Sequence, residues 1–256
     1  MSSVLKISAV SYLNTKPFLF GLEHSSILEN IELSLDTPAL VAQKLLNNEA
    51  DIGLVPVAVI PKLNHPSIIS SFCIGANGTV KTVCLFSNVP IHEIKTVYLD
   101  NQSRTSVLLV QLLFKEYWKK EVSFLPAFDG YEKAIRGDTA AVIIGDRAIV
   151  ALGMHVYEYD LAEAWKQYTG LPFVFAAWVS NKPVHEDFII EFDAALRLGL
   201  YAREELANEY NQYNTPSFSV KEYWNTNIQY HLDDDKKKAL SVFLQKLNYG
   251  LNYTYH

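Results

Sequence analysis

The sequence predicts an α/β protein of two lobes that close on a central cleft, in the form of a clamshell. Short apolar runs alternate with helix-like stretches over most of the chain, which is typical of a parallel-type α/β architecture. The alternation forms two blocks, and polar, proline-containing segments at 87–90 and 178–183 separate them. A helical block follows at 186–252. In such a fold the ligand binds between the lobes, at the carboxyl ends of the strands.

The first block begins with an apolar strand at 4–10, and an alternating, half-buried strand follows at 31–36. Thr37 and Pro38 predict the start of a helix over 38–48, because threonine is a common N-cap and proline is favoured in the first turn. Further strands are expected at 51–60, 67–74 and 79–87.

The second block repeats this rhythm, and a helical pattern replaces it after residue 180. Strands are expected at 95–100, 121–127, 139–145, 155–160 and 173–180, and helices at 103–118, 130–137, from 146, and at 161–168. Asp160 and Glu163 have the spacing of a capping box at the start of the last of these helices. The final helices are expected at 186–210, 220–229 and 233–252.

These elements predict how the chain divides. Residues 1–87 and 179–256 are expected to form lobe I, and residues 88–178 to form lobe II. The chain then crosses between the lobes twice, and the C-terminal helices pack back on the first lobe.

Composition excludes several classes of protein. The chain has 256 residues, of which 49% are hydrophobic and 20% charged, as in ordinary globular proteins. A net charge of −6 without a basic block predicts no nucleic-acid partner. No apolar run spans a membrane and no leader pattern is present, so we expect a cytoplasmic protein without a membrane partner. Cys73 and Cys84 lie in apolar surroundings without metal-ligand spacing, which predicts no metal site.

Three polar stretches stand where strands give way to helices: "SYLNTKP" at 11–17, "DNQSRTS" at 100–106 and "IGDRA" at 144–148. Backbone N–H groups at a helix start bind anions, and hydroxyl side chains extend such a cradle. Arg104 adds a cation suited to a bidentate contact with a carboxylate. Each stretch by itself is also typical of an ordinary helix cap. Together they predict a small ligand that carries a carboxylate.

Few side chains offer reactive chemistry. The seven histidines lie at predicted turns, element ends or in the tail region, and no nucleophile-elbow, P-loop or dinucleotide-binding motif is present. Asp146 follows a buried strand and opens a helix, so it is a general base or ligand acceptor on one interpretation and an N-cap on the other.

Five stretches together resemble the chorismate dehydratases of the futalosine route to menaquinone. They are "VSYLNTKPF", "DIGLVPVAVIP", "DNQSRTSVLLVQLL", "IGDRAI" and "YDLAEAWKQYTGLPFVFAAWV", in order over 10–179. That family is similar to type II periplasmic binding proteins, which have two lobes and agree with the expected clamshell. The resemblance implies a carbon–oxygen lyase that removes water from chorismate to give 3-[(1-carboxyvinyl)oxy]benzoate without a cofactor.

The resemblance also implies a set of site residues. Asn14 and Thr82 correspond to the key active-site positions, although the family more usually has serine at the second. Residues 103–106 match the second-lobe substrate clamp, and Asp146 matches a Gly-Asp position. The candidate substrate-binding residues are Ser11, Tyr12, Thr15, Ser103, Arg104, Thr105, Ser106 and Asp146.

The identity of the base stays open. An amide is no base near neutral pH, so Asn14 is expected to donate a hydrogen bond that orients the substrate or stabilises developing charge. The proton acceptor is then either the enolpyruvyl carboxylate of the substrate or Asp146.

Two other functions are compatible with this fold. A 1,4-dihydroxy-6-naphthoate synthase-like enzyme of the same pathway would start with a motif like "SPCPNDT" and use a histidine, and the stretch at 139–150 contains none. A non-catalytic protein that binds small carboxylates would need export or a lipid anchor.

Overall fold

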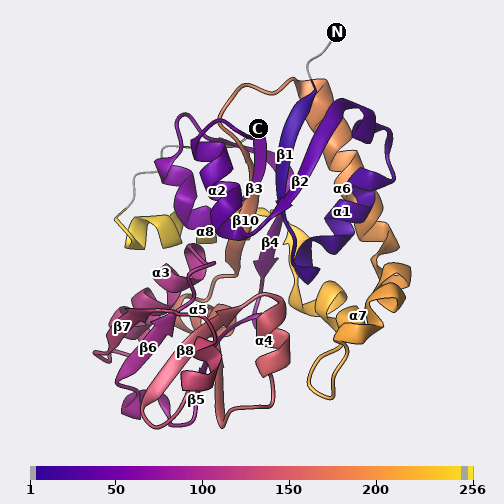
Figure 1. Cartoon of the computed structure of the whole chain (residues 1–256). Coiled ribbons are helices and arrows are strands. Elements are labelled where there is room, and N and C mark those ends of the chain that lie inside the picture. Colours follow the sequence, from indigo (N-terminus) through magenta and orange to yellow (C-terminus); the bar gives the residue numbers. More distant parts are fainter. Residues whose placement is uncertain (1–3, 249–252, 256) are drawn as a thin grey trace.

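A computed structural model describes residues 4–248 and 253–255 and contains two β-sheets in two lobes (Figure 1). Over these residues the first sheet has seven strands. Its spatial order is β11 (Gln229–His231), β4 (Ser67–Ala76), β10 (Phe173–Ser180), β3 (Ile52–Pro56), β1 (Leu5–Val10) and β2 (Ile31–Asp36), and β12 (Thr254–Tyr255) pairs with β4. The second sheet has the order β7 (Ser123–Pro126), β6 (Thr96–Leu99), β8 (Thr139–Ile144), β5 (Val83–Ser87) and β9 (Tyr157–Asp160).

Both sheets are mixed, where the sequence pattern indicated parallel sheets. β1 runs parallel to β2 and β3, but β10 is antiparallel to β3 and β4. In the second sheet β6 is parallel to its neighbours, and β5 is antiparallel to β8 and β9. The antiparallel strands β5 and β10 are those that the chain forms directly after it passes from one sheet to the other.

Helices cover both sheets. The α-helices are α1 (Lys16–Glu23), α2 (Pro38–Leu46), α3 (Thr105–Leu112), α4 (Asp146–Ala151), α5 (Leu161–Thr169), α6 (Glu186–Leu206), α7 (Val220–Glu222) and α8 (Asp234–Lys246). The short 3-10 segments are η1 (Leu13–Thr15), η2 (Ser26–Asn30), η3 (Val57–Lys62), η4 (Ile91–Glu93), η6 (Tyr131–Ala134) and η7 (Ala207–Tyr213), and η5 (Leu113–Tyr117) and η8 (Tyr223–Asn227) are π-helical. In the described part of the chain, no helix has both the length and the apolar character that a membrane crossing needs.

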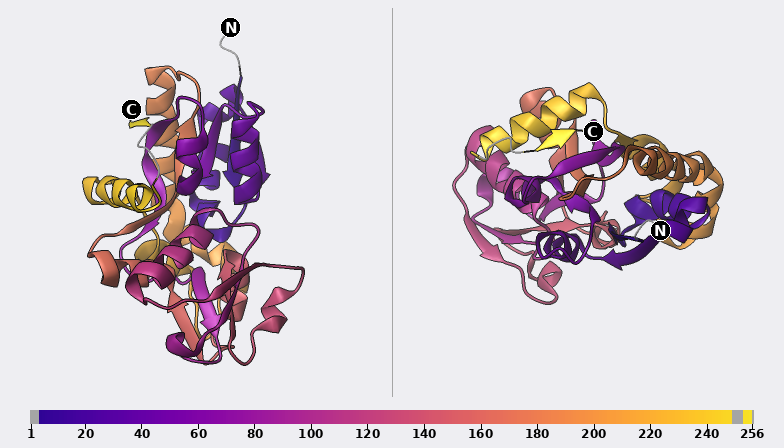
Figure 2. Two further views of the ribbon diagram at one scale, coloured as in Figure 1. Left: turned by 90° about the vertical axis from the view of Figure 1, so that its left-hand side faces the viewer. Right: turned by 90° about the horizontal axis from the view of Figure 1, so that it is seen from above.

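Helix α1, which begins directly after the "SYLNT" turn, packs closely on α6 (Figures 1 and 2). The close approach depends on Gly21 and Gly199. A Cβ atom at Gly21 would collide with the carbonyl oxygen of Ala195, and one at Gly199 with that of Pro17. This crossing places the first turn of α1 against the C-terminal half of the chain.

The strands that share a sheet favour other lobe boundaries than the expected ones. The strand at 83–87, expected in lobe I, pairs in the second sheet, and residues 173–178, expected in lobe II, belong to β10 of the first sheet. We therefore propose that the connections between lobes are 77–82 and 170–172. They contain backbone with positive φ at Gly78, Lys81 and Gly170, which is suited to sharp turns. The proline-containing segment at 87–90 is instead a loop within the second lobe.

The C-terminal block also differs from the expectation that it is wholly helical. β11 adds three residues to the edge of β4, a length too short to produce a recognisable alternation. α8 packs against β10 on the outside of the first lobe (Figure 2). Its predicted extension over 249–252 lies outside the described residues.

Candidate active site

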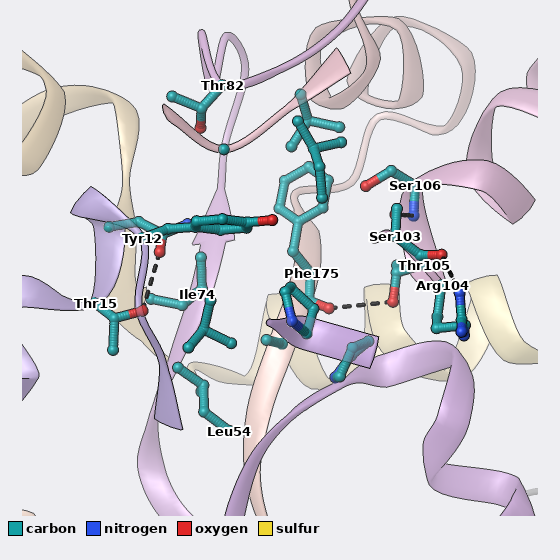
Figure 3. Close-up of a pocket in the computed structure, with 18 of the residues that line it drawn as sticks. Tyr12, Thr15, Leu54, Ile74, Thr82, Ser103, Arg104, Thr105, Ser106 and Phe175 are labelled. Carbon is teal, nitrogen blue, oxygen red and sulfur yellow. Dashed lines mark hydrogen bonds between the residues drawn. The ribbon is translucent and has the colours of Figure 1, made fainter. Parts of the chain in front are cut away.

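A cleft lies between the lobes, where the end of β1, the connection at 77–82 and the start of α3 meet (Figure 3). Apolar side chains, among them Leu54, Ile74 and Phe175, line one part of it. Hydroxyl, amide and guanidinium groups line the rest. The cleft therefore suits a small ligand with an apolar ring and polar substituents.

The turn at 12–15 brings Asn14 to the cleft. β1 ends at Val10, and the chain passes through η1 into α1. The Thr15 hydroxyl, which is buried, donates a hydrogen bond of 3.0 Å to Asn14 Oδ1. Because the amide oxygen is held in this way, its Nδ2 group supplies the donors that Asn14 can offer to other partners.

Aromatic side chains from the C-terminal block hold the same turn from behind. Trp224 Nε1 donates to the carbonyl oxygen of Leu13 at 2.9 Å, and the Tyr230 hydroxyl donates to the carbonyl oxygen of Asn14 at 3.0 Å. Both aromatic side chains are buried. Buried hydrogen bonds of this kind fix the backbone on either side of the Asn14 Cα atom.

Tyr12 connects the turn to the second lobe. Its hydroxyl donates to Gln102 Oε1 at 2.7 Å, and its ring packs on Gly145. Gly145 has φ +63°, and a Cβ there would lie 2.8 Å from the Tyr12 ring, so both conformation and space require glycine. Burial, with Asp100 nearby, raises the pKa of Tyr12 well above its usual value and keeps the phenol neutral.

The start of α3 forms the second-lobe side of the cleft. Ser103 Oγ accepts the Ser106 N–H of the first turn at 3.1 Å. The Thr105 hydroxyl accepts the Ala58 N–H at 3.3 Å and donates to the Phe175 carbonyl oxygen at 3.2 Å, so it ties the two lobes together. Arg104 is the one charged residue among the described residues that line the cleft.

Thr82 ends the connection at 77–82 rather than lying in a strand. Its hydroxyl oxygen lies 2.7 Å from the Tyr223 hydroxyl oxygen, and its carbonyl accepts the Gly145 N–H at 2.9 Å. The residues before it are held by Asp160, which accepts the N–H groups of Val80 at 2.8 Å and Lys81 at 2.7 Å.

The other oxygen of Asp160 caps α5. It accepts the N–H groups of Ala162 at 3.0 Å and Glu163 at 3.1 Å. The N-cap expected at Asp160 is therefore confirmed, and the same carboxylate also fixes the approach to Thr82.

Eight of the ten expected site residues line the cleft, and Ser11 and Asp146 are not among them. The Ser11 N–H donates to the Asp36 carbonyl in the first sheet. Asp146 Oδ1 accepts the Leu13 N–H at 2.9 Å, which is a contact between lobes. Burial raises the pKa of Asp146, while the Leu13 N–H, Lys16 and Tyr213 act in the opposite direction. No cluster of three or more metal-ligating side chains occurs among the described residues.

The sequence profile of the menaquinone biosynthesis family matches residues 5–249, nearly the whole chain. The chain belongs to this family. A relative from Thermus thermophilus named chorismate dehydratase is 29% identical over 268 residues, with 92% of each chain covered.

Solved structures show the same fold at low sequence identity. A protein from Archaeoglobus fulgidus superposes with a TM-score of 0.73 at 15% identity, covering 95% of this chain and 96% of that one. A Candida albicans protein described as having the generic periplasmic binding protein fold gives 0.60 at 15% identity, covering 98% and 95%. The alkanesulfonate-binding protein of Xanthomonas axonopodis bound to MOPS gives 0.62 at 12% identity, covering 98% of each chain. This member of the menaquinone biosynthesis family therefore has a periplasmic binding protein-like fold.

Sequence reasoning missed the aromatic residues of the C-terminal block that support the cleft of this protein. Tyr223, Trp224 and Tyr230 contact the turn at 12–15 or Thr82 from more than 140 positions away. The available signal was the aromatic stretch "EYWNTNIQY" at 222–230, in which buried aromatics carry polar groups that need partners.

We predict that Asp160→Asn destabilises the protein by about 1–3 kcal/mol, because an amide N–H₂ replaces an oxygen that accepts backbone N–H groups. The variant should also displace the connection at 77–82, because Asp160 accepts the N–H groups of Val80 and Lys81, and this should lower any activity that depends on Thr82. Thermal or denaturant unfolding measures the first effect. Glu163→Gln is the control, since this more exposed carboxylate accepts a single bond from Thr79. Equal stability of the two variants would contradict the role of Asp160.

Proposed function

We propose that this protein is a chorismate dehydratase, which removes water from chorismate to give 3-[(1-carboxyvinyl)oxy]benzoate in menaquinone biosynthesis. The observation that carries the proposal is the cleft itself: neutral donors and one arginine surround an apolar space, in a member of the menaquinone biosynthesis family. The name of the Thermus thermophilus relative supports the same assignment.

The polar groups suit a dicarboxylate with a six-membered ring. Arg104 and the N–H groups at the start of α3 are suited to hold one carboxylate. Leu54, Ile74 and Phe175 offer contacts to the ring. Asn14 lies on the first-lobe side of the cleft, and Thr82 lies on the connection between lobes. Both side chains are then available to form hydrogen bonds with the ether and hydroxyl substituents of the substrate.

Among the described residues that line the cleft there is no aspartate, glutamate or histidine. We therefore favour the enolpyruvyl carboxylate of the substrate as proton acceptor. It takes the proton from the ring carbon that bears the ether, and hydroxide leaves from the neighbouring carbon. The proton and hydroxide together account for the water lost, and the ring becomes aromatic.

In this reaction the protein binds and orients the substrate, and the substrate itself supplies the base. The Asn14 amide donates to the substrate and stabilises charge that develops as the proton is removed. We assign the Thr82 hydroxyl as the donor to the leaving oxygen. The reaction involves no net oxidation or reduction.

The lining of the cleft also distinguishes between the two alternative functions. A naphthoate synthase-like enzyme would need a histidine, and the described residues that line the cleft include none. A binding protein without chemistry is distinguished by turnover alone. We also infer a cytoplasmic location, which suits a member of a biosynthetic family.

We predict that the purified protein converts chorismate to 3-[(1-carboxyvinyl)oxy]benzoate, measured by chromatography and mass spectrometry of the product. Asn14→Ala should lower the rate by about 10²–10³-fold, because it removes a donor that acts on developing charge. Binding of chorismate without turnover would indicate the binding-protein alternative. A rate unchanged in Asn14→Ala would contradict the role of Asn14.

Asp146→Asn separates the two candidate bases. Asparagine keeps an oxygen that can accept the Leu13 N–H, but it cannot take a proton. We expect kcat within about threefold of the wild type, since Asp146 acts as a contact between lobes on this account. A loss of about 10²-fold or more would instead assign Asp146 as the general base.

A further inference from the structure

The hydroxyl group of Tyr223 lies behind the candidate catalytic side chain of Thr82 and contacts its hydroxyl group. Tyr223 comes from η8 of the C-terminal block and is 1% exposed. Its oxygen lies 2.7 Å from Thr82 Oγ1, and the Asn14 side chain is a further polar neighbour of the same hydroxyl. One buried phenol therefore contacts the residue that ends the connection between lobes and lies beside a first-lobe residue of the site.

The direction of these hydrogen bonds follows from the donors available. Thr15 donates to Asn14 Oδ1, so Asn14 faces other groups with Nδ2, which can only donate. We infer that Tyr223 directs its single proton to Thr82 Oγ1, because its other polar neighbour, Asn14 Nδ2, can only donate. Thr82, having accepted this bond, keeps its own proton for a group in the cleft.

We propose that Tyr223 is a positioning residue for the dehydration, and that it makes Thr82 the hydrogen-bond donor to the leaving hydroxyl group of the substrate. This inference rests on the proposed function. Tyr223 does not line the cleft and acts through Thr82. Burial raises the pKa of Tyr223 well above its usual value, so the phenol stays protonated and remains a donor to Thr82.

The chain of hydrogen bonds also explains why threonine suffices where the family usually has serine. The hydroxyl must accept from Tyr223 and donate into the cleft, and threonine can do both. Its additional methyl group limits rotation about χ1, which helps to hold the hydroxyl in one direction.

The test is a set of single and double variants measured with chorismate. Tyr223→Phe keeps the ring and removes the hydroxyl, and we expect kcat to fall by about 10- to 100-fold, as for a misoriented reacting group. We expect KM to stay within about threefold, because no group that touches the substrate is removed. Thr82→Val removes the hydroxyl and should lower kcat, whereas Thr82→Ser keeps the hydroxyl and should have a kcat close to that of the wild type.

The double variant Tyr223→Phe/Thr82→Val distinguishes positioning from general loss of structure. If Tyr223 acts through Thr82, its kcat equals that of Thr82→Val alone, whereas independent effects would multiply. Tyr168→Phe is the matched control, since its hydroxyl donates to Glu116 far from the cleft, and it should keep wild-type kcat.

The outcomes separate this inference from the proposed function. A wild-type protein inactive on chorismate overturns both. An active wild type with unchanged kcat in Tyr223→Phe overturns the inference and leaves the proposed function standing, and so do multiplicative effects in the double variant. Should Tyr223→Phe fail to fold, Thr82→Val decides, because an unchanged kcat in that variant leaves Tyr223 nothing to act through.

Discussion

Two buried aromatic donors, the indole of Trp224 and the hydroxyl of Tyr230, hold the carbonyl groups of Leu13 and Asn14, and the rest of the candidate site depends on that attachment. The turn at 12–15 stands at the carboxyl end of β1, where hydrogen bonds of the sheet no longer constrain the chain. The two donors replace the missing sheet partners from the opposite end of the sequence. The tight crossing of α1 and α6 at Gly21 and Gly199 supports the same arrangement.

Contacts between the lobes complete the site. Tyr12 reaches Gln102, the Leu13 N–H reaches Asp146, and Thr105 contacts the backbone of the first lobe. Each of these bonds takes one partner from each lobe, so they form together only when the lobes are close. A cleft assembled in this way excludes water when it closes, which protects a reaction that begins with removal of a proton from carbon. The polar stretches after the strands therefore supply contacts between the lobes as well as groups that line the cleft.

The order of strands and helices could be predicted from the sequence because local periodicity reports burial, and most elements lie where the pattern indicated. Strand direction and lobe boundaries could not be predicted in this way. β5 and β10 run antiparallel to their neighbours, and this depends on where the chain crosses between lobes. The proline-containing segment at 87–90 resembled a crossing, while the crossing that we propose at 77–82 contains the positive φ angles of Gly78 and Lys81.

The candidate site shows the same division. Residues close in sequence to Asn14 and to the start of α3 were accessible from local motifs, and seven of them line the cleft. Asp146 looked like a cleft residue because it follows a buried strand, but its carboxylate contacts the Leu13 N–H. Tyr223, Trp224 and Tyr230 could not be assigned, because nothing local indicates which distant carbonyl or hydroxyl group a buried aromatic donor will meet.

The most direct measurement of this account compares Trp224→Phe with Trp178→Phe in kcat on chorismate and in melting temperature. Both indoles are buried, but Trp224 Nε1 bonds to Leu13, whereas Trp178 Nε1 has no hydrogen-bond partner among the described residues. We predict a larger loss of stability in Trp224→Phe, because the Leu13 carbonyl loses its partner, and a kcat reduced by about 10- to 100-fold in Trp224→Phe alone. Equal kcat in the two variants would contradict the claim that the C-terminal block positions Asn14.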